Sequence, residues 1–185
     1  MRYIVEHLEP EVYDWCLIEY NHISKIVGKE NLIFTNVKNG KQKLKGLGEV
    51  KEKSVAELGL KNTCVLDLDA DIELHPDDKK FDYLIFGGIL GDFPPKKRTK
   101  AELSSKLKGE KRNLGNKQMP TDTAVYVAKN IIEGKKLNEF EFKDEIEIDI
   151  REGESIILPF RYVVENNKVI LPDGFVEFLK KRKGF

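Results

Sequence analysis

Two loops of this 185-residue chain combine glycines with polar and apolar residues in a way that suits a bound ligand. The first, FGGILGDFPP (86–95), follows an apolar run typical of a buried parallel strand. Ligands of open α/β sheets bind beyond such strand ends, and glycine lets a ligand approach the backbone closely. The second, LGNKQMPTDTA (114–124), leads into an apolar helical stripe. The two loops form one binding site only if they lie side by side.

A phosphate site fits the first loop badly. The GK[ST] ending of a P-loop is absent, and Pro94 and Pro95 follow the glycines closely. A proline biases the residue before it away from the helical region, so no helix amino terminus can face a pyrophosphate here. The loop is therefore not a phosphate cradle.

The second loop suits a ligand with a flat, apolar part and a polar tail. Leu114 and Met119 can pack against a ring, while Gly115 leaves backbone donors and acceptors free. Thr121 or Asp122 can cap the helix that follows, and capping alone is the more frequent role of such residues. Capping does not account for the glycine and the methionine in the same turn.

The elements that must position these loops follow from hydrophobic patterning. Apolar runs predict strands at 2–7, 31–37, 63–69 and 81–88, and helices are expected at 10–28, 54–60 and 121–133. Strands that read as continuous apolar runs between helical segments are typical of a parallel sheet covered on both faces. The sequence thus predicts an α/β fold with a mainly parallel sheet and helices on both faces.

The pattern changes after the helix at 121–133. Segment 139–150 alternates strictly, with apolar residues at even positions and an acidic opposite face, which predicts a half-buried strand or hairpin. Further strands are expected at 154–164 and 168–172, followed by a terminal helix at 173–185 capped by Asp173. We therefore expect a core over 1–135 and a small β-rich elaboration with a terminal helix over 136–185, packed on the same domain.

The charge balance and the cysteine content limit the classes of function that the sequence allows. The chain has 32 basic and 32 acidic residues, which argues against a purely electrostatic nucleic-acid binder. Basic residues gather in segment 96–117, which is either a possible RNA contact or a solvated linker and helix face. Cys16 and Cys64 lack CxxC spacing and read as buried thiols, and the histidines have no metal-ligand spacing. No metal is expected.

The amino-terminal segment MRYIVEHLEP carries Glu6 and Glu9 where a signal peptide needs its apolar stretch. No apolar run approaches the length of a membrane span. We expect a cytoplasmic protein with no membrane association.

Six segments resemble a small methyltransferase family of archaea and eukaryotes within the SPOUT superfamily, labelled in some classifications as S-adenosylmethionine-dependent RNA methyltransferases. The segments are YIVEHLEPEVYDWCLIEY, HISKIVG, LIFTNV, LIFGGILGDFPP, LGNKQMPTDTA and ILPFRY. They extend over almost the whole chain, in order. The resemblance implies an α/β domain whose chain forms a trefoil knot, S-adenosyl-L-methionine held by the knot loops, and a monomer or a homodimer.

The two loops would then be the two walls of the cofactor site. The residues implied as cofactor-binding are Phe86, Gly87, Gly88, Ile89, Leu90, Gly91, Asp92, Leu114, Gly115, Gln118, Met119, Thr121, Asp122, Thr123 and Ala124. The chemistry is sensible, because a cofactor without phosphate needs an apolar slot, backbone partners and positioning rather than a helix amino terminus.

Two substrate classes remain open. The family label implies RNA, whereas the eukaryotic relatives are understood to methylate an arginine of a small-subunit ribosomal protein, so a ribosomal protein or subunit is the expected partner. A guanidinium arrives protonated, and carboxylates are its natural clamp. We expect Glu6 and His7 to contact the substrate first, then Asp92, with Glu19 as a further candidate. A third possibility is a cofactor-binding module without activity of its own.

Overall fold

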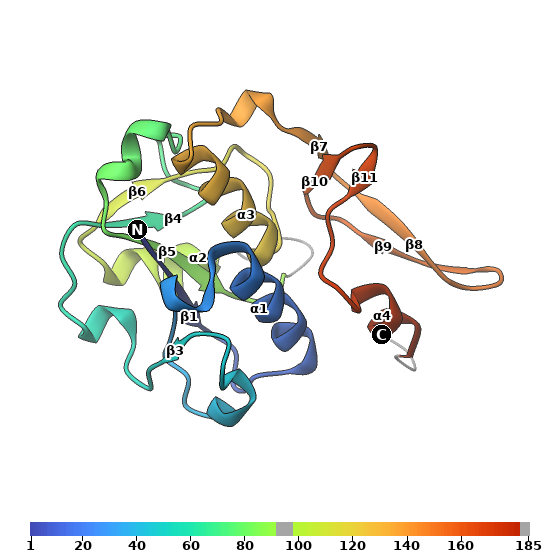
Figure 1. Ribbon diagram of the computed structural model, residues 1–185, viewed down its shortest axis with the longest axis horizontal. Helices are drawn as coiled ribbons and strands as arrows, with labels where there is room; N and C mark the ends of the chain where they lie inside the picture. The colour runs from blue at the N-terminus through green and yellow to red at the C-terminus, as the bar shows by residue number, and fades with distance from the viewer. Residues whose placement is uncertain (92–97, 182–185) are drawn as a thin grey trace.

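The computed structural model describes residues 1–91 and 98–181. A six-stranded sheet with the order β3-β2-β1-β5-β4-β6 forms its centre (Figure 1). All neighbouring strands in it run parallel. The strands are β1 (Arg2–His7), β2 (Leu32–Thr35), β3 (Glu49–Val50), β4 (Thr63–Leu66), β5 (Tyr83–Gly88) and β6 (Glu110–Arg112). The parallel α/β sheet expected from the sequence is confirmed.

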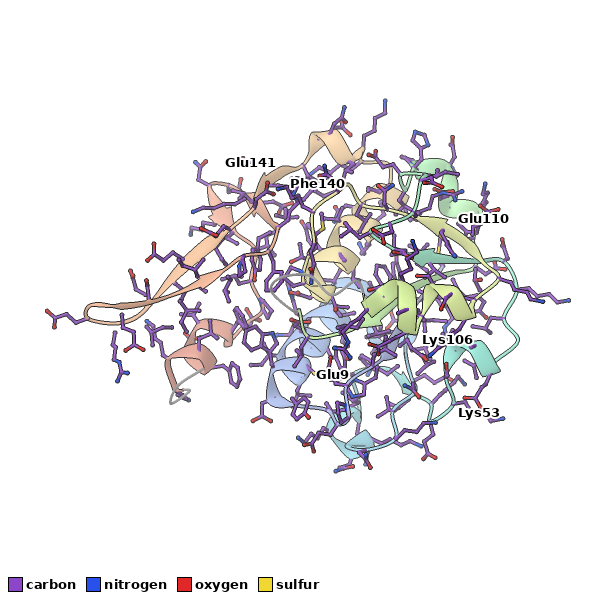
Figure 2. All side chains as sticks on the ribbon, turned by 180° about the vertical axis from the view of Figure 1, so that it is seen from behind. Glu9, Lys53, Lys106, Glu110, Phe140 and Glu141 are labelled. Atoms are coloured by element: carbon purple, nitrogen blue, oxygen red, sulfur yellow. The ribbon has the colours of Figure 1, made fainter. Side chains whose placement is uncertain are left out.

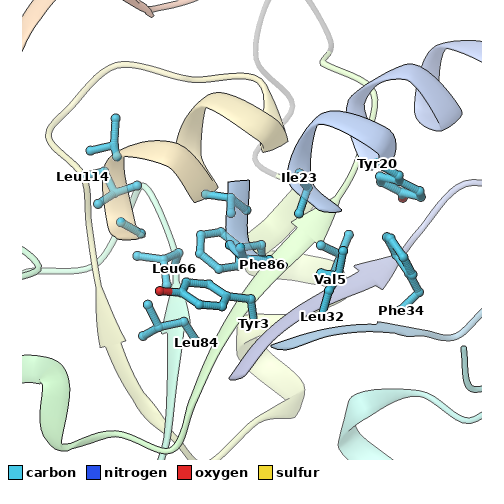
Figure 3. Packing of buried hydrophobic residues seen from close by; sticks show 14 of the residues in the cluster. Tyr3, Val5, Tyr20, Ile23, Leu32, Phe34, Leu66, Leu84, Phe86 and Leu114 are labelled. Atoms are coloured by element: carbon cyan, nitrogen blue, oxygen red, sulfur yellow. The ribbon is translucent and has the colours of Figure 1, made fainter. Parts of the chain in front are cut away.

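Helices cover both faces of this sheet. On one face lie α1 (Asp14–Val27) and α3 (Thr121–Ile132), which pack on Tyr3, Val5 and Phe86 (Figure 3). On the other face Ile4 and Ile85 pack with residues beside α2 (Arg98–Glu102) and with a short 3-10 turn at Val55–Glu57. Side chains alternate between the faces along β1 because strand residues point to opposite sides in turn.

The carboxyl-terminal part of the chain, from β7 onward, lies beside this core, next to α1 (Figure 1). It contains a three-stranded antiparallel sheet of β7 (Glu141–Lys143), β10 (Tyr162–Glu165) and β11 (Lys168–Val169), and a hairpin of β8 (Ile146–Arg151) and β9 (Glu154–Leu158). Helix α4 (Phe175–Lys181) follows. Trp15 and Ile18 of α1 pack into the apolar cluster that these elements share.

Several elements differ from the sequence expectations. Strands β3 and β6 have only two and three residues, too few for a visible apolar run. The helix expected at 54–60 is a single 3-10 turn, and α1 begins at Asp14 rather than at Pro10. Segment 139–150 alternates as predicted but divides between β7 and β8, which belong to different sheets.

The terminal helix begins two residues after Asp173, whose carboxylate accepts a hydrogen bond from Lys25 Nζ at 2.8 Å. Within residues 1–91 and 98–181, none of the helices has the length and apolarity needed to cross a bilayer.

Candidate active site

A cavity lies at the carboxyl edge of the sheet, where β4, β5 and the loop before α3 come together; we call it the first cavity. The chain ends of β4 and β5 contribute Leu66, Phe86 and Gly87 among others, and the second loop contributes residues from Leu114 to Ala124. Because parallel strands end at the same edge of a sheet, loops distant in sequence meet there. The two loops recognised in the sequence therefore line one cavity.

A hydrogen bond joins the two loops directly. Thr121 Oγ1 donates to the carbonyl oxygen of Gly87 at 3.2 Å. Gly115 has a φ of 86° and donates its backbone N–H to Asn113 Oδ1 at 2.9 Å, which closes the turn that leads into the cavity wall. A side chain is strained at such a φ, so the sequence needs glycine at this position.

The lining of the first cavity has an apolar and a polar part. Leu66, Phe86, Leu114 and Ala124 can pack on a flat ring, while Gln118 and Thr99 offer hydrogen bonds. Two acidic residues directly after β4, Asp67 and Asp69, also line the cavity. This division matches the ligand with a flat apolar part and a polar tail that the second loop predicts.

A second cavity adjoins the first and shares Ile89 and Met119 with it. Its walls come from four parts of the chain: α1, the first loop, the start of α3 and the carboxyl-terminal elements. Its apolar lining includes four aromatic side chains, namely Trp15, Phe160, Tyr162 and Phe175. Trp15 and Phe175 pack edge to face with their ring centroids 5.1 Å apart.

Two buried carboxylates face this aromatic cavity, Glu19 from α1 and Asp122 from α3. Glu19 Oε1 accepts a hydrogen bond from Trp15 Nε1 at 2.9 Å, and Asp122 Oδ2 lies 2.7 Å from His22 Nδ1. Burial, and then the nearby charge of Asp122, hold the pKa of Glu19 well above its ordinary value. The second cavity is thus an apolar pocket with two carboxylates, and a cationic group bound there would stabilise their charged forms.

The comparisons with known proteins bear on this arrangement. Residues 2–184 match the family model described as "Protein arginine N-methyltransferase SFM1-like". The chain is 37% identical over 205 residues to the protein arginine N-methyltransferase SFM1 of Saccharomyces cerevisiae, covering 98% of this chain and 95% of that one. The chain belongs to the SFM1-like family.

Solved structures agree with this assignment. The crystal structure of yeast SFM1 complexed with SAH superposes with a TM-score of 0.88 at 36% identity, covering 97% of this chain and 94% of that one. The dual-specific Trm10 of Thermococcus kodakaraensis has a TM-score of 0.54 at 18% identity, covering 75% of this chain and 96% of that one. The second likeness supports the fold alone. The trefoil knot implied by the resemblance stays a prediction.

Most of the cofactor-binding residues expected from the sequence line one of the two cavities of this SFM1-like protein. Those on the first cavity are Phe86, Gly87, Ile89, Leu114, Gly115, Gln118, Met119, Thr121 and Ala124. Leu90, Gly91 and Asp122 line the second cavity instead. The first loop thus runs past one cavity into the wall of the next. Asp92, expected both in the cofactor site and as a substrate contact, lies outside the described residues.

Gly88 and Thr123 line neither cavity. Thr123 is buried. A Cβ on Gly88 would contact the Tyr20 hydroxyl and come within 2.8 Å of Val5 Cγ1. Gly88 therefore lets β5 lie close to α1 and does not open the ligand site.

Glu6 and His7 point to opposite faces of the sheet, so the structure does not bring the two together on one substrate. Glu6 accepts hydrogen bonds from Thr35 Oγ1, from Ser54 Oγ at 2.5 Å and from the Val55 N–H at 2.9 Å. These donors lie on the face away from α1, and Glu6 lines neither of the two cavities described above. A contact of Glu6 with substrate stays an untested prediction.

His7 is buried beneath α1, with its Nδ1 2.8 Å from the Tyr20 hydroxyl. Burial lowers its pKa, against smaller opposing effects that include the charges of Glu9 and Glu6. Its Nε2 has no hydrogen-bond partner among the residues that the structure describes. Like Glu6, His7 is absent from the linings of both cavities.

Several residues near the cavities are not among those expected from the sequence. Asp67 and Asp69 belong to the strand predicted at 63–69. Glu9 was read only as evidence against a signal peptide, yet its carboxylate accepts from the Leu90 N–H at 3.1 Å and from Arg98 Nη1 at 2.8 Å. Glu9 thereby ties the first loop to α2. Acidic residues after a buried strand were a usable signal for the first pair.

The described part of the basic segment, residues 98–117, does not form one continuous surface. Arg112 is buried and pairs with Asp78, and Arg98 pairs with Glu9 and Glu102. Lys100 and Lys117 line the first cavity, whereas Lys106 and Lys108 lie at a different cavity. Figure 2 shows Lys106 on the side of the molecule away from the β8–β9 hairpin. Lys96 and Lys97 lie outside the described residues.

Proposed function

We propose that this protein transfers a methyl group from S-adenosyl-L-methionine to an arginine side chain of a ribosomal protein. The first cavity holds the cofactor and the second holds the guanidinium. Membership of the SFM1-like family supports methyl transfer to arginine, and relatives solved as complexes with SAM, SAH and MTA support the cofactor.

One observation carries the arginine assignment: the second cavity places Glu19 and Asp122 within an aromatic lining directly beside the first cavity. A guanidinium keeps its charge at any physiological pH and presents a planar fork of N–H donors that matches carboxylate oxygens. The aromatic walls can stack on its plane. Ionising a buried carboxylate without a cation is costly, as the raised pKa of Glu19 reflects, so a bound arginine would stabilise the charged form of Glu19.

The residues of the chain mainly position the reactants. S-adenosyl-L-methionine supplies an electrophilic methyl group on a sulfonium, which is a good leaving group. Leu66, Phe86 and Leu114 would hold its adenine, and Asp69 and Gln118 can bind its polar atoms. Glu19 and Asp122 would orient the guanidinium nitrogen toward Ile89 and Met119, where the two cavities meet. Such alignment can lower a barrier by roughly 7–11 kcal/mol.

The ribosomal target rests on the resemblance noted in the sequence, and a charge feature is compatible with it. The β8–β9 hairpin, whose β9 contributes Ile156 to the second cavity, exposes Glu147 and Asp149 on its outer face. Ribosomal proteins are basic, so such a hairpin would attract their surfaces at low ionic strength.

Methylation of RNA is the alternative. It would need an exposed basic surface near the methyl donor, and Lys100 and Lys117 at the first cavity are the residues that favour it. The ion pairs of Arg98 and Arg112 reduce the basic surface that is free for phosphates.

The deciding experiment incubates the protein with methyl-labelled cofactor and small ribosomal subunits from cells that lack this chain. Protein and RNA are then separated, and the protein fraction is hydrolysed for amino-acid analysis. We expect label in methylarginine, and far less of it with Glu19→Gln than with the exposed control Glu30→Gln. Label in rRNA would overturn the arginine assignment. Label in neither fraction would favour a cofactor-binding module without activity.

A further inference from the structure

We infer that His22 is a positioning residue that acts through Asp122: it takes up the proton that the arginine loses on methylation and passes it to solvent. This inference rests on the proposed function, because it needs an arginine in the second cavity. His22 itself does not line either cavity.

Asp122 lies between the second cavity and His22. Its carboxylate lines the second cavity and its side chain is only 3% exposed. On the other side its Oδ2 lies 2.7 Å from Nδ1 of His22, a residue a hundred positions away in the sequence. The His22 side chain is 15% exposed, so the imidazole lies between a buried carboxylate and the protein surface.

The chemistry requires a proton to leave. Transfer forms a bond between the guanidinium nitrogen and the methyl carbon and breaks the carbon–sulfur bond, whose electron pair stays on sulfur. The nitrogen gives up one proton, so a guanidinium enters and a methylguanidinium of the same charge leaves. One proton per turnover must therefore travel from an aromatic-lined cavity to water.

Among the described residues, Glu19 and Asp122 are the carboxylates that line the second cavity, but a buried carboxylate that keeps the proton cannot serve the next turnover. An imidazole can accept a proton at one ring nitrogen and release one from the other, and histidine titrates in the physiological range. His22 is placed to regenerate Asp122 in this way. Glu19 instead accepts a hydrogen bond from the indole N–H of Trp15, a group that only donates and cannot take up a proton.

Charged and titratable groups surround His22 on several elements. Asp122 faces it from α3, and Glu19 and Tyr162 lie beyond Asp122 at the cavity. On the surface side, Lys25 pairs with Asp173 at 2.8 Å. Lys25 is the main cause of the lowered pKa of Asp173, and His22 contributes to it. The imidazole therefore lies between the buried carboxylate of Asp122 and the surface ion pair of Lys25 and Asp173.

The test compares His22→Asn with wild type in the subunit methylation assay. Asparagine keeps a hydrogen-bond donor close to the position of Nδ1 but cannot titrate. We expect kcat to fall roughly 10²-fold, with KM and cofactor affinity close to those of wild type. The dependence of kcat on pH should weaken in the variant. The matched control is His75→Asn, an exposed histidine whose Nδ1 lies 3.3 Å from Asp77 on another part of the surface.

Each outcome of this test either supports or overturns the proposed role of His22. An unchanged kcat, or a reduced kcat with the wild-type pH profile, would overturn the role of His22 and leave the proposed function intact. Absence of methylarginine with wild-type protein would overturn the proposed function and this inference with it. If His22→Asn does not bind cofactor normally, His22→Ala with added imidazole replaces it: recovery of activity would support the route, and no recovery would overturn it.

Discussion

Ile89 and Met119 each line both cavities, so one residue from each loop forms the boundary between them. A methyl group must cross this boundary if the cofactor and the arginine occupy the two cavities. The loops are joined beside it by the hydrogen bond from Thr121 to Gly87. In the proposed arrangement the loop pair therefore binds the cofactor and also sets where the acceptor must approach.

Replacing the carboxylate of Glu19 tests whether the second cavity binds the arginine. Glu19→Gln keeps the shape of the side chain and can still face Trp15, but it removes the charge that would clamp the guanidinium. We expect kcat/KM for the protein substrate to fall roughly 10²-fold or more, while calorimetric titration gives unchanged cofactor affinity. The exposed Glu30→Gln is the control. Equal loss of cofactor binding would place the cofactor, rather than the arginine, beside Glu19.

The Glu19→Gln variant also tests how the stability of the folded protein depends on pH. Burial and Asp122 raise the pKa of Glu19, so the folded state holds this proton to a higher pH than the unfolded state does. Wild-type stability is therefore lost as pH rises from the ordinary glutamate pKa, about 4.3, through the raised folded pKa. The Glu19→Gln variant has no ionisable group at this position, so this loss of stability does not occur in it.

Denaturant unfolding at pH 5 and pH 8 measures the difference. The free energy of unfolding of Glu19→Gln should exceed that of wild type by more at pH 8 than at pH 5. Each unit by which the pKa is raised contributes about 1.4 kcal/mol. A difference that is constant with pH, or that shrinks as pH rises, would contradict the raised pKa.

Gly87 and Gly88 are adjacent, yet alanine should affect them differently. A Cβ on Gly87 would lie 3.2 Å from Ile89 Cδ1 and 3.4 Å from Thr99 Oγ1, in the first cavity. We expect Gly87→Ala to weaken cofactor binding about tenfold, or ~1.4 kcal/mol, with near-normal stability. Gly88→Ala should instead cost about 1–3 kcal/mol of stability through overpacking against Val5 and Tyr20.

Titration calorimetry and denaturant unfolding of both variants separate these effects. If Gly88→Ala were fully stable but unable to bind cofactor, the assignment of the cofactor to the first cavity would be wrong.

Glu6 provides a contrasting test. Its oxygens accept from Ser54, Val55 and Thr35 on the face of the sheet opposite to α1. Glu6→Gln puts an amide donor among these donors, so we expect a loss of about 1–3 kcal/mol of stability. Methyl transfer by the folded fraction should be unchanged. Loss of transfer in a stable variant would instead support contact of Glu6 with the substrate.

Some of the site could be predicted from the sequence because it depends on local signals. Glycines after a buried strand and a polar turn before α3 indicated the two loops, and both line the first cavity. The opposite orientations of Glu6 and His7 were also predictable, since neighbouring residues of a strand face opposite sides.

The second cavity could not be predicted, for a physical reason. It needs Trp15 and Glu19 of α1 to meet Phe160, Tyr162 and other residues of the carboxyl-terminal elements. No local pattern specifies such a contact. Asp122 reads as a helix cap in the sequence, whereas its partner in the structure is His22. Long-range packing, not propensity, creates the second cavity.

The most direct test of the account is a crystal structure with a bisubstrate compound in which a guanidine is joined through a short linker to the 5′ position of adenosine. We predict that the adenine packs on Phe86 and Leu114, and that the guanidine lies within hydrogen-bond distance of Glu19 or Asp122. A guanidine that lies in solvent, or an adenine bound in the aromatic second cavity, would contradict the arrangement of one cavity for the donor and one for the acceptor.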